Sequence, residues 1–562
     1  MKKLFVILMT LVIILPTCCI AAIAEEPITL RVAAYMGENE PDGFLSDPVT
    51  KYIEESLGIR MEVTHTREAD WSNQLAALMA ANDLPDVFIL SNVTTELPKL
   101  LDAEQILCID DYLDSATQST SIPAIQAMME ANRMYSNDGK LYSWGLCLGD
   151  WSDGTKPTAG NYIRWDLYAK LGYPEINSYM DLLDVLEQMV ALEPQTSTGL
   201  PTYALGAWFG DGQTWALANI DYFGAHSEGI YTIPSGYTFA INTLDSTPVA
   251  ENQLTTTSSR FWTAVDFYAE AYRRGLLDPD SFTMTQQMWQ DKISAGQYMY
   301  CMFGWEATDA NSEFYKNEGN AMEFISIPSI NGVVEGRISN MFAGERKYCI
   351  SAQTQYPEKC VELLDFVSTY ENSLILINGL EGDTWNRDEN GELVPTDEYL
   401  ACDREDDVYR TTHGNYVWNH FMAFSNGVFW EDGNTCIDLW QFSEEAMAAN
   451  TTATMQDFLD HYGVTSQLQA YLNETENNTI NNFYVVPTLD DMMTMYVSNL
   501  SDYVYKNVFK LITCETEEAY EAQKAEFIEG AVKNNADEIF EYFYQTAVDQ
   551  AESMSSLASY FQ

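Results

Sequence analysis

The first ninety residues alternate between strand patterns and helix patterns, and this order constrains the fold more than any other feature. Apolar residues occupy every second position of 28–35 and of 59–63, and the helix pattern between them ends at Gly58. A second helix pattern ends before Pro85, and a short apolar strand covers 87–90. Strands that alternate with helices predict a mainly parallel sheet flanked by helices.

The carboxyl ends of these strands are expected to form a binding edge, because ligands of such sheets lie outside those ends. Tyr35 ends the first strand. The third strand follows a tight turn at 83–86 and leads into Ser91 and Asn92. We therefore predict that Tyr35 and Asn92 lie where a ligand binds.

The chain is too long for one hydrophobic core. Its 562 residues predict two or more domains, and an apolar fraction of 46% can fill sizeable cores. Another strand–helix pattern covers 161–174, and the chain from Tyr496 onward is almost wholly helical. The sequence has no tandem repeat and no long linker, so domain boundaries follow only from the order of elements.

Residues 1–24 are predicted to be an export signal peptide. Two lysines open the chain, an apolar run covers 4–15, and small residues precede a cleavage point after Ala24. A rival cleavage at Cys18 or Cys19, as in lipoproteins, is also compatible with the sequence. Both alternatives place the protein outside the cytoplasm, either secreted or tethered to the outer face of the membrane.

Acidic residues greatly outnumber basic ones. The 84 Asp and Glu against 28 Lys and Arg give a formal net charge of −56. Such a charge repels phosphate backbones and anionic surfaces. We therefore expect no nucleic-acid partner and favour a neutral or cationic ligand.

Motifs of common enzymes and metal sites are absent from the sequence. The cysteines beyond Cys19 form no CxxC pair, and HExxH, GxSxG and GxxxxGK[ST] do not occur. His413 and His420 lie seven positions apart, with no third ligand nearby in sequence. We predict no metal, no cofactor and no catalytic residue, while the disulfide state of the cysteines stays open.

Six short segments, taken in order, resemble those of one protein family. They are DLPDVF (83–88), DGKLY (138–142), YIRWDLYAKLG (162–172), GLLDPDSF (275–282), SAGQYMYCMFGW (294–305) and INGLEGDTW (377–385). Their order over most of 28–548 resembles that of bacterial extracellular solute-binding proteins of family 1. The last segment and the helical C-terminal part are similar to the LplA-like branch, a group of carbohydrate ABC transporter substrate-binding proteins.

The resemblance implies an α/β, two-lobed periplasmic-binding-protein type II fold. Each lobe is expected to have a mainly parallel sheet flanked by helices, with the ligand cleft between the lobes. We expect the chain to cross between lobes near residues 147, 345 and 380. The N-terminal lobe then comprises 25–147 plus 345–380, and the C-terminal lobe 148–344 plus 381–562.

The same resemblance implies the extracytoplasmic binding component of an ABC importer. Such a protein captures an oligosaccharide by closure of its lobes and delivers it to membrane permease subunits. We expect it to act as a monomer and not as an enzyme. Two alternatives stay open: the same family binding a peptide or another small solute, and a secreted carbohydrate-active hydrolase.

Candidate ligand-binding residues follow from sugar chemistry. Aromatic rings pack on apolar C–H faces, and polar side chains pair with hydroxyls. Each aromatic candidate can equally pack in a core. The candidates stand at strand ends and in loops: Tyr35, Asn92, Asp150, Trp151, Trp208, Trp305, Glu306 and Trp385.

Two segments bear on calcium. Many LplA-like members carry an acidic calcium-binding loop where this chain has EPQTSTGLP at 193–201. Only Glu193 remains of the expected carboxylates, and calcium needs several oxygen ligands, so we predict that this site is lost. A weaker EF-hand-like spacing at 386–397 lacks its first and last ligands, so we predict a hairpin turn there instead.

Overall fold

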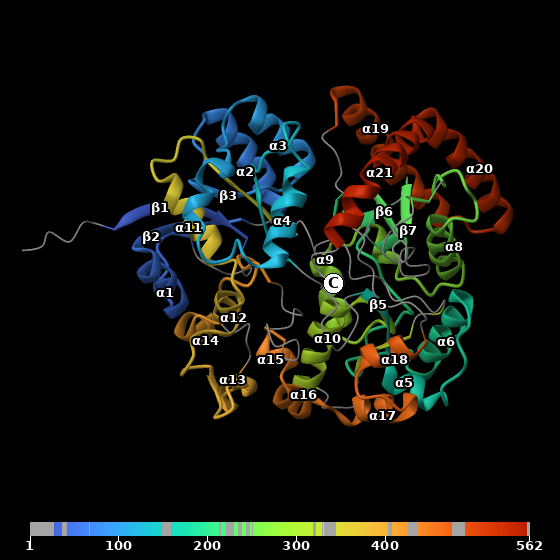
Figure 1. Ribbon diagram of the computed structural model, residues 1–562. Coiled ribbons are helices and arrows are strands. Elements are labelled where there is room, and N and C mark those ends of the chain that lie inside the picture. The colour runs from blue at the N-terminus through green and yellow to red at the C-terminus, as the bar shows by residue number, and fades with distance from the viewer. Residues whose placement is uncertain are drawn as a thin grey trace, which may run out of the picture.

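The computed structural model shows two lobes (Figure 1). The residues that the structure describes are 27–35, 42–66, 68–148, 159–212, 215–217, 219–220, 230–233, 239–242, 248–249, 251–317, 322–328, 330, 344, 346–402, 407–424, 436–474 and 489–558.

The first lobe is built on a five-stranded sheet in the order β2–β1–β3–β11–β4. Its strands are β1 (Ile28–Ala34), β2 (Ile59–His65), β3 (Val87–Ile89), β4 (Trp144–Leu146) and β11 (Arg346–Ile350). Its helices are α1 (Pro48–Leu57), α2 (Glu68–Ala81), α3 (Val93–Asp102), α4 (Pro123–Arg133), α11 (Pro357–Phe366), α12 (Tyr370–Asn378), α13 (Asp397–Ala401) and α14 (Asp407–His413), with a 3-10 turn at Ile109–Ser115.

The predicted β-α-β-α-β order of the first ninety residues is confirmed. β1 pairs in parallel with β2 and with β3, as the alternation of strands and helices requires. Local chemistry sets the boundaries of α1: the Asp47 carboxylate accepts a hydrogen bond from Thr50 N at 2.8 Å, and Gly58 ends the helix at φ 64°.

The second lobe contains a three-stranded sheet in the order β10–β5–β9, with β5 (Ala159–Arg164), β9 (Tyr300–Phe303) and β10 (Phe324–Ile327). A separate antiparallel sheet holds β6 (Ile230–Ile233), β7 (Phe239–Asn242) and β8 (Pro248–Val249). The helices are α5 (Trp165–Lys170), α6 (Tyr179–Leu192), α8 (Arg260–Arg273), α9 (Gln286–Ser294), α10 (Gly304–Asn317), α17 (Ala453–Tyr462), α18 (Gln467–Glu474), α19 (Asp491–Ile512), α20 (Glu517–Lys533) and α21 (Ala536–Ala558), with 3-10 turns at Trp215–Leu217 and Pro279–Phe282.

The expectation of a mainly parallel sheet in each lobe needs a correction in the second lobe. β5 is antiparallel to both β9 and β10, and the parallel pairs of this lobe among the described residues are the isolated bridges Tyr203–Tyr298 and Leu205–Leu277. The reason is the path of the chain. β5 enters this lobe from the first one and therefore runs away from the junction, as β11 does when it enters the first lobe.

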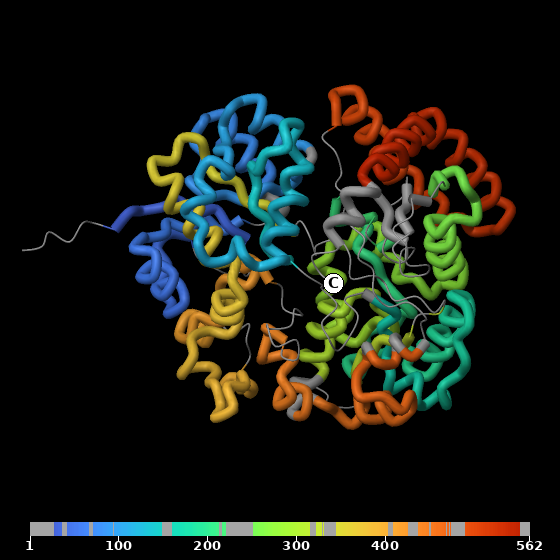
Figure 2. Tube along the Cα trace, viewed as in Figure 1, coloured from blue at the N-terminus to red at the C-terminus, as the bar shows by residue number. Residues whose placement is uncertain are grey.

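The two hydrophobic cores place one segment differently from the predicted lobe boundaries. The core of the first lobe includes Trp385, Leu393, Trp418, Phe421 and Leu439, all beyond residue 380. Figure 2 shows the yellow and gold parts of the chain beside the blue N-terminal part. This packing leads us to propose that the described parts of this segment, 381–402, 407–424 and 436–439, belong with the N-terminal lobe.

The third crossing then lies near α15 (Leu439–Phe442) and α16 (Glu444–Asn450), which precede α17. Leu439 packs in the first core, whereas Phe458 of α17 packs in the second. The other two passages between the sheets run from β4 to β5 and from β10 to β11.

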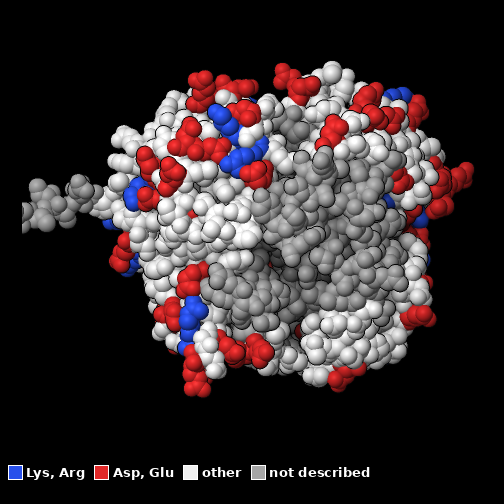
Figure 3. Space-filling model, viewed as in Figure 1, with Lys and Arg blue, Asp and Glu red and all other residues white. Residues whose placement is uncertain are grey.

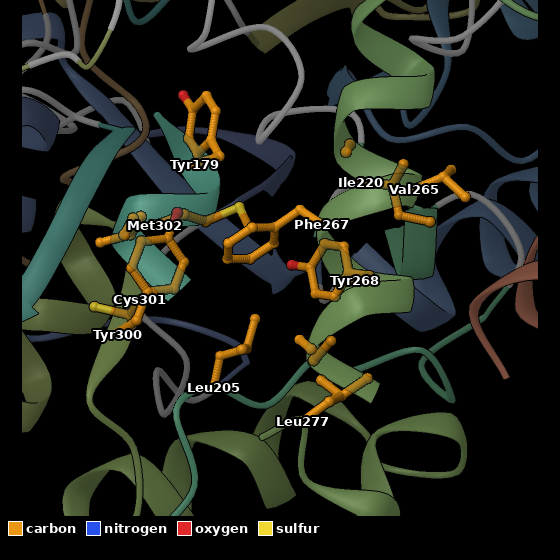
Figure 4. Close-up of a cluster of buried hydrophobic side chains, with 14 of the residues drawn as sticks. Tyr179, Leu205, Ile220, Val265, Phe267, Tyr268, Leu277, Tyr300, Cys301 and Met302 are labelled. Atoms are coloured by element: carbon orange, nitrogen blue, oxygen red, sulfur yellow. The ribbon is translucent and has the colours of Figure 1, made fainter. Parts of the chain in front are cut away.

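The second core is large and rich in aromatic residues (Figure 4). Phe267 and Tyr268 of α8 lie in it with Tyr300 of β9, and the C-terminal helices close it from outside, as Val504 and Phe527 show. Within the part of the chain that the structure describes, no helix combines the length and apolar character needed to cross a bilayer. Acidic side chains dominate the charged atoms of the face in Figure 3.

Candidate ligand-binding site

The carboxyl edge of the first sheet lies at the junction between the lobes. β4 runs parallel to β1, β2 and β3, and the chain leaves the end of β4 for the second lobe. The carboxyl ends of all four strands therefore lie at the junction. Tyr35 and Asn92, which follow β1 and β3, are placed on this edge as predicted.

Asn92 caps helix α3. Its side-chain oxygen accepts a hydrogen bond from Thr95 N at 3.2 Å, and Asn92 is itself exposed. Glu96 accepts from the backbone N–H groups of Ser91 and Asn92 at 2.8 and 2.9 Å. Ser91 and Asn92 therefore form the turn between β3 and α3, and the Glu96 carboxylate accepts hydrogen bonds from the backbone amides of this turn.

Tyr35 lies at the centre of a group of rings and a cation. The ring of His420 meets it edge-on with centroids 4.7 Å apart, and the ring of His65 lies 6.4 Å away. The guanidinium carbon of Arg346 lies 4.4 Å from the Tyr35 ring centroid, a cation–π geometry. We name Tyr35, His65, Arg346 and His420 the Tyr35 cluster.

Buried groups behind this edge are held by the crossing segments. Cys147 donates its N–H to Met422 O at 2.8 Å. Gly344 has φ +76°, and a Cβ there would lie 2.5 Å from Leu146 O, so only glycine fits this approach. Burial, together with the nearby Arg346 and His65, lowers the pKa of His420 well below its usual 6.5, so this imidazole is neutral at neutral pH.

The second lobe presents aromatic residues at its own junction edge. β9 runs parallel to β10, whose end leads back to the first lobe, so the residues that follow β9 lie at the junction. Trp305 is 36% exposed and stacks on Phe303 at 5.6 Å and 23°. The ring centroid of the buried Trp208 lies 6.4 Å from that of Trp305 and 5.3 Å from that of Trp289.

Glu306 lies beneath this aromatic edge, at the start of α10. It has no exposed surface, and its Oε2 accepts a hydrogen bond from Phe303 N at 3.4 Å. Its Oε1 has no hydrogen-bond partner among the described residues. Burial raises the pKa of Glu306 well above its usual 4.5, so the neutral acid is favoured. The side chain of Glu306 is therefore buried in this conformation and does not line the surface.

Two other candidate residues, Trp208 and Trp385, are buried. Trp385 has no exposed surface and donates its indole N–H to Gly379 O at 2.9 Å in the first core. Trp208 is 1% exposed and supports Trp305. Neither ring has a free face on which a sugar could stack in this conformation. Asp150 and Trp151 lie outside the described residues.

Sequence reasoning missed three members of the Tyr35 cluster. His65 ends β2 two positions after the predicted strand, at the same edge as Tyr35. Extending that strand would have found it. Arg346 begins β11 beside the predicted crossing, but no sequence signal connects it with Tyr35. His420 is brought to this edge by the unpredicted return of 417–424 to the first core.

The 193–201 loop, where we predict that a calcium site is lost, contacts the side chain of a buried arginine. Arg164 is fully buried and bonds Asp166 through Nε at 2.7 Å, while its Nη1 lies 3.4 Å from Glu193. Thr202 Oγ1 donates to Glu193 O at 2.5 Å. A guanidinium therefore takes the position of counter-ion to the one remaining carboxylate of 193–201.

The side chains of the described residues form no group suited to a metal ion. No cluster of three or more His, Cys, Asp or Glu side chains suited to a metal occurs among the described residues. The EF-hand-like segment forms a hairpin as predicted: β12 (Trp385–Arg387) pairs antiparallel with β13 (Leu393–Pro395), and Asp388 accepts hydrogen bonds from the turn amides Asn390 and Glu392 at 2.8 Å.

Comparison with solved structures places this geometry in a known fold. An HMO-binding ABC-transporter-associated solute-binding protein of Bifidobacterium longum infantis is 14% identical, with a TM-score of 0.61 over 93% of this chain and 99% of that one. The substrate-binding protein FusA of S. pneumoniae, solved with kestose, is 15% identical, with a TM-score of 0.61 over 94% and 99%.

The chain has the two-lobed solute-binding-protein fold. The alginate-binding protein AlgQ2, solved without calcium ion, shares it with a TM-score of 0.61 at 15% identity over 93% of this chain and 98% of that one. These neighbours are binding proteins, not enzymes, by their names. No protein-family profile matches the sequence, and no curated protein matches it.

Proposed function

We propose that this protein is the extracytoplasmic solute-binding component of an ABC importer and that its ligand is an oligosaccharide. The observation that carries the proposal is the near-complete coverage of both chains in comparisons with oligosaccharide-binding proteins, over both lobes. The predicted export signal agrees with an extracytoplasmic location.

The two junction edges supply complementary chemistry for a sugar. Trp305 offers an exposed indole to the C–H face of a pyranose, and the Tyr35 cluster offers N–H and O–H groups to hydroxyls. In our proposal a ligand contacts both edges only when the lobes close. Because only the closed state makes both sets of contacts, the ligand shifts the population toward that state.

Closed protein would then dock on permease subunits, which supply the energy for import together with an ATPase. The sequence has no GxxxxGK[ST] loop of its own. Binding of about micromolar affinity, on the order of −8 kcal/mol, allows both capture and release.

Binding and turnover can be measured together. Purified protein is mixed with a panel of neutral and acidic oligosaccharides and of short peptides, and Trp fluorescence, melting temperature and product formation are followed. We expect an oligosaccharide to change the fluorescence and to raise stability by about 2.7 kcal/mol at one hundred times Kd, without products. Binding of peptides alone would contradict the sugar assignment, and release of hydrolysis products would contradict the assignment as a binding protein.

A further inference from the structure

A cavity of about 410 Å³ opens in the second lobe on the side away from the junction. Tyr203 and Tyr272 line it, together with the apolar Leu277 and Pro279. Tyr203 pairs with Tyr298, which precedes β9, whereas the junction lies at the other end of that strand. The volume falls within the range of about 300–1,000 Å³ that is usual for pockets of small ligands. We name this space the outer cavity, and it is separate from the proposed sugar site.

Two helices end at the outer cavity. Tyr272 and Gly275 line it at the C-terminal end of α8, which Figure 1 shows on the side of the second lobe that faces away from the first. Glu515 lines it too and follows Ile512, the last residue of α19, by three positions. The C-terminal end of a helix carries about half a unit of negative charge, which acts over the last turn. The backbone therefore gives the outer cavity a negative potential.

Glu515 adds a full negative charge. Its side chain is exposed and forms no hydrogen bond or ion pair with the residues that the structure describes. Other carboxylates at this end of the lobe have a cation as partner: Asp184 pairs with Arg274, and Asp278 pairs with Lys292. A cationic ligand would give Glu515 the partner that the protein does not supply.

Arg273 also lines the cavity, but its charge is offset by two carboxylates. Its Nε and Nη2 donate to Glu270 at 3.0 and 2.7 Å, and Nη2 lies 3.1 Å from Glu517. The guanidinium carbon lies 5.5 Å from the ring centroid of Tyr520, and the remaining nitrogen, Nη1, is buried. The arginine is thus directed into the protein and does not reverse the sign set by the helix ends and Glu515.

The two tyrosine rings supply the surface that an organic cation prefers. Tyr272 meets Phe282 edge-on with centroids 6.0 Å apart, and no cation of the described residues lies over the ring of Tyr203 or of Tyr272. Aromatic faces attract ammonium groups, and the attraction grows where water is partly excluded. Leu277 and Pro279 offer contact to apolar substituents, from which a hydrated inorganic ion would gain nothing.

We propose that the outer cavity binds a small organic cation, an ammonium group with apolar substituents. The ammonium group lies against the rings of Tyr203 and Tyr272 and pairs with Glu515, and the apolar part contacts Leu277. This inference goes beyond the proposed function and does not depend on it. The protein would hold two ligands of different chemistry at opposite ends of the second lobe, and its net charge of −56 would attract the cation at long range.

The test compares choline with dimethylbutanol, its neutral isostere that has carbon in place of the charged nitrogen. Each compound is titrated into the purified protein by calorimetry at constant ionic strength. We expect choline to bind about tenfold tighter than dimethylbutanol, because only choline carries the charge that the rings and Glu515 attract. Butylammonium, titrated in the same way, distinguishes a preference for a primary ammonium group from one for a quaternary group.

Variants locate the site. Glu515→Gln should weaken choline binding about threefold, because it removes an exposed charge without disturbing the core. Glu518→Gln is the matched control: Glu518 is an exposed carboxylate three positions further on, and it does not line the cavity. Tyr272→Leu should weaken binding more than Tyr272→Phe, since phenylalanine keeps an aromatic face. A melting curve identifies variants that fail to fold, and Glu515→Gln decides if Tyr272→Leu is one of them.

Equal binding of choline and dimethylbutanol, or no binding of either cation, would overturn the inference. Equal effects of Glu515→Gln and Glu518→Gln would overturn it as well, because the cation would then respond to net charge alone. Oligosaccharides are titrated into the same samples. Their failure to bind would contradict the proposed function and leave this inference intact.

Discussion

The two lobes meet the junction with different surfaces. The first lobe ends in the Tyr35 cluster, where a cation and two imidazoles surround one phenol ring. The second ends in Trp305, stacked on Phe303 above the buried Trp208. One edge suits polar and charged groups of a ligand and the other suits its apolar faces. A sugar has both kinds of surface, so the difference indicates a division of labour between the lobes.

The lobes also differ in how they bury charge. In the second lobe, Arg164 is paired with Asp166 and Glu193. In the first, the buried Asp365 accepts hydrogen bonds from Gln118 N and from Ser119 N and Oγ, at 2.8, 2.8 and 2.6 Å. Removing one partner of a buried ion pair leaves an uncompensated charge, which costs more stability than removing one of several hydrogen-bond donors to a carboxylate.

The largest expected effect tests this contrast. Arg164→Gln should destabilise the protein by about 3–5 kcal/mol, because it removes the buried guanidinium that pairs with both Asp166 and Glu193 and leaves Asp166 only the more distant Lys170 at 3.8 Å. Asp365→Asn, in the first lobe, should cost less, about 1.5–3 kcal/mol. Denaturant unfolding measures both.

Calcium sharpens the same comparison. Chelator and excess calcium should leave the melting temperature of the wild-type protein unchanged, because Arg164 already neutralises the loop. A wild-type protein stabilised by calcium would contradict the predicted loss of the site.

The crossing into the first lobe depends on glycine. Gly344→Ala should destabilise by more than 2 kcal/mol, on the order of a left-handed alanine plus a clash, since its Cβ would lie 2.5 Å from Leu146 O. Gly172→Ala in the second lobe is the matched control, with φ +80° and open space around the added methyl group. It should cost about 1 kcal/mol. Equal losses would show that the close approach has no energetic weight.

The aromatic edge is tested by Trp305→Ala. We expect the affinity for a bound oligosaccharide to fall about tenfold or more, equivalent to about 1.4 kcal/mol, because the exposed stacking face is lost. Trp305→Phe should retain part of the affinity. Met288→Ala, at a 47% exposed apolar residue of the same lobe, should not change it. Unchanged affinity in Trp305→Ala would remove the second edge from the proposed site.

The two lobes are also expected to show opposite pH dependences. Glu306 keeps its proton in the native state, because burial raises its pKa, whereas the unfolded chain releases it above about pH 4.5. Stability contributed by this residue is therefore lost as pH rises from about 4.5. Glu306→Gln should be more stable than the wild type at pH 7, and the difference should shrink toward pH 4.5.

His420 has the opposite sign. Burial lowers its pKa, so below about pH 6.5 the unfolded chain takes up a proton that the native state does not. Its contribution falls as pH drops, by at most about 1.4 kcal/mol per pH unit. His420→Asn should reduce this acid sensitivity. The difference in unfolding free energy between variant and wild type, measured from pH 4.5 to 8, isolates the contribution of each residue. Slopes of the same sign for the two variants would contradict this assignment.

Local patterns predicted the elements of the first ninety residues well. Alternation and capping are properties of neighbouring residues, so the strands at 28–34, 59–65 and 87–89 and the cap at Asp47 follow from short windows. The same reasoning placed Tyr35 and Asn92 at the carboxyl edge, because a parallel sheet orders the ends of its strands.

Long-range packing decided the rest. Trp305 and Trp385 have similar sequence surroundings, each close to glycines and acidic residues, yet one is exposed and the other fully buried. Burial depends on what covers a ring, and for Trp385 that cover comes from the first core.

The sequence by itself determined the order of strands and helices, the acidic surface and the two-lobed resemblance, because these depend on composition and on neighbours in the chain. Only the tertiary structure decided that Arg346 lies on Tyr35 and that 417–424 returns to the first lobe. Arg346 and Tyr35 are 311 positions apart in the sequence, and Trp418 and Thr50, which share a hydrogen bond, are 368 positions apart. These contacts form because the chain crosses between the lobes and brings distant segments to one edge of the first sheet. A short window of sequence contains only one of the two partners and therefore cannot predict the contact.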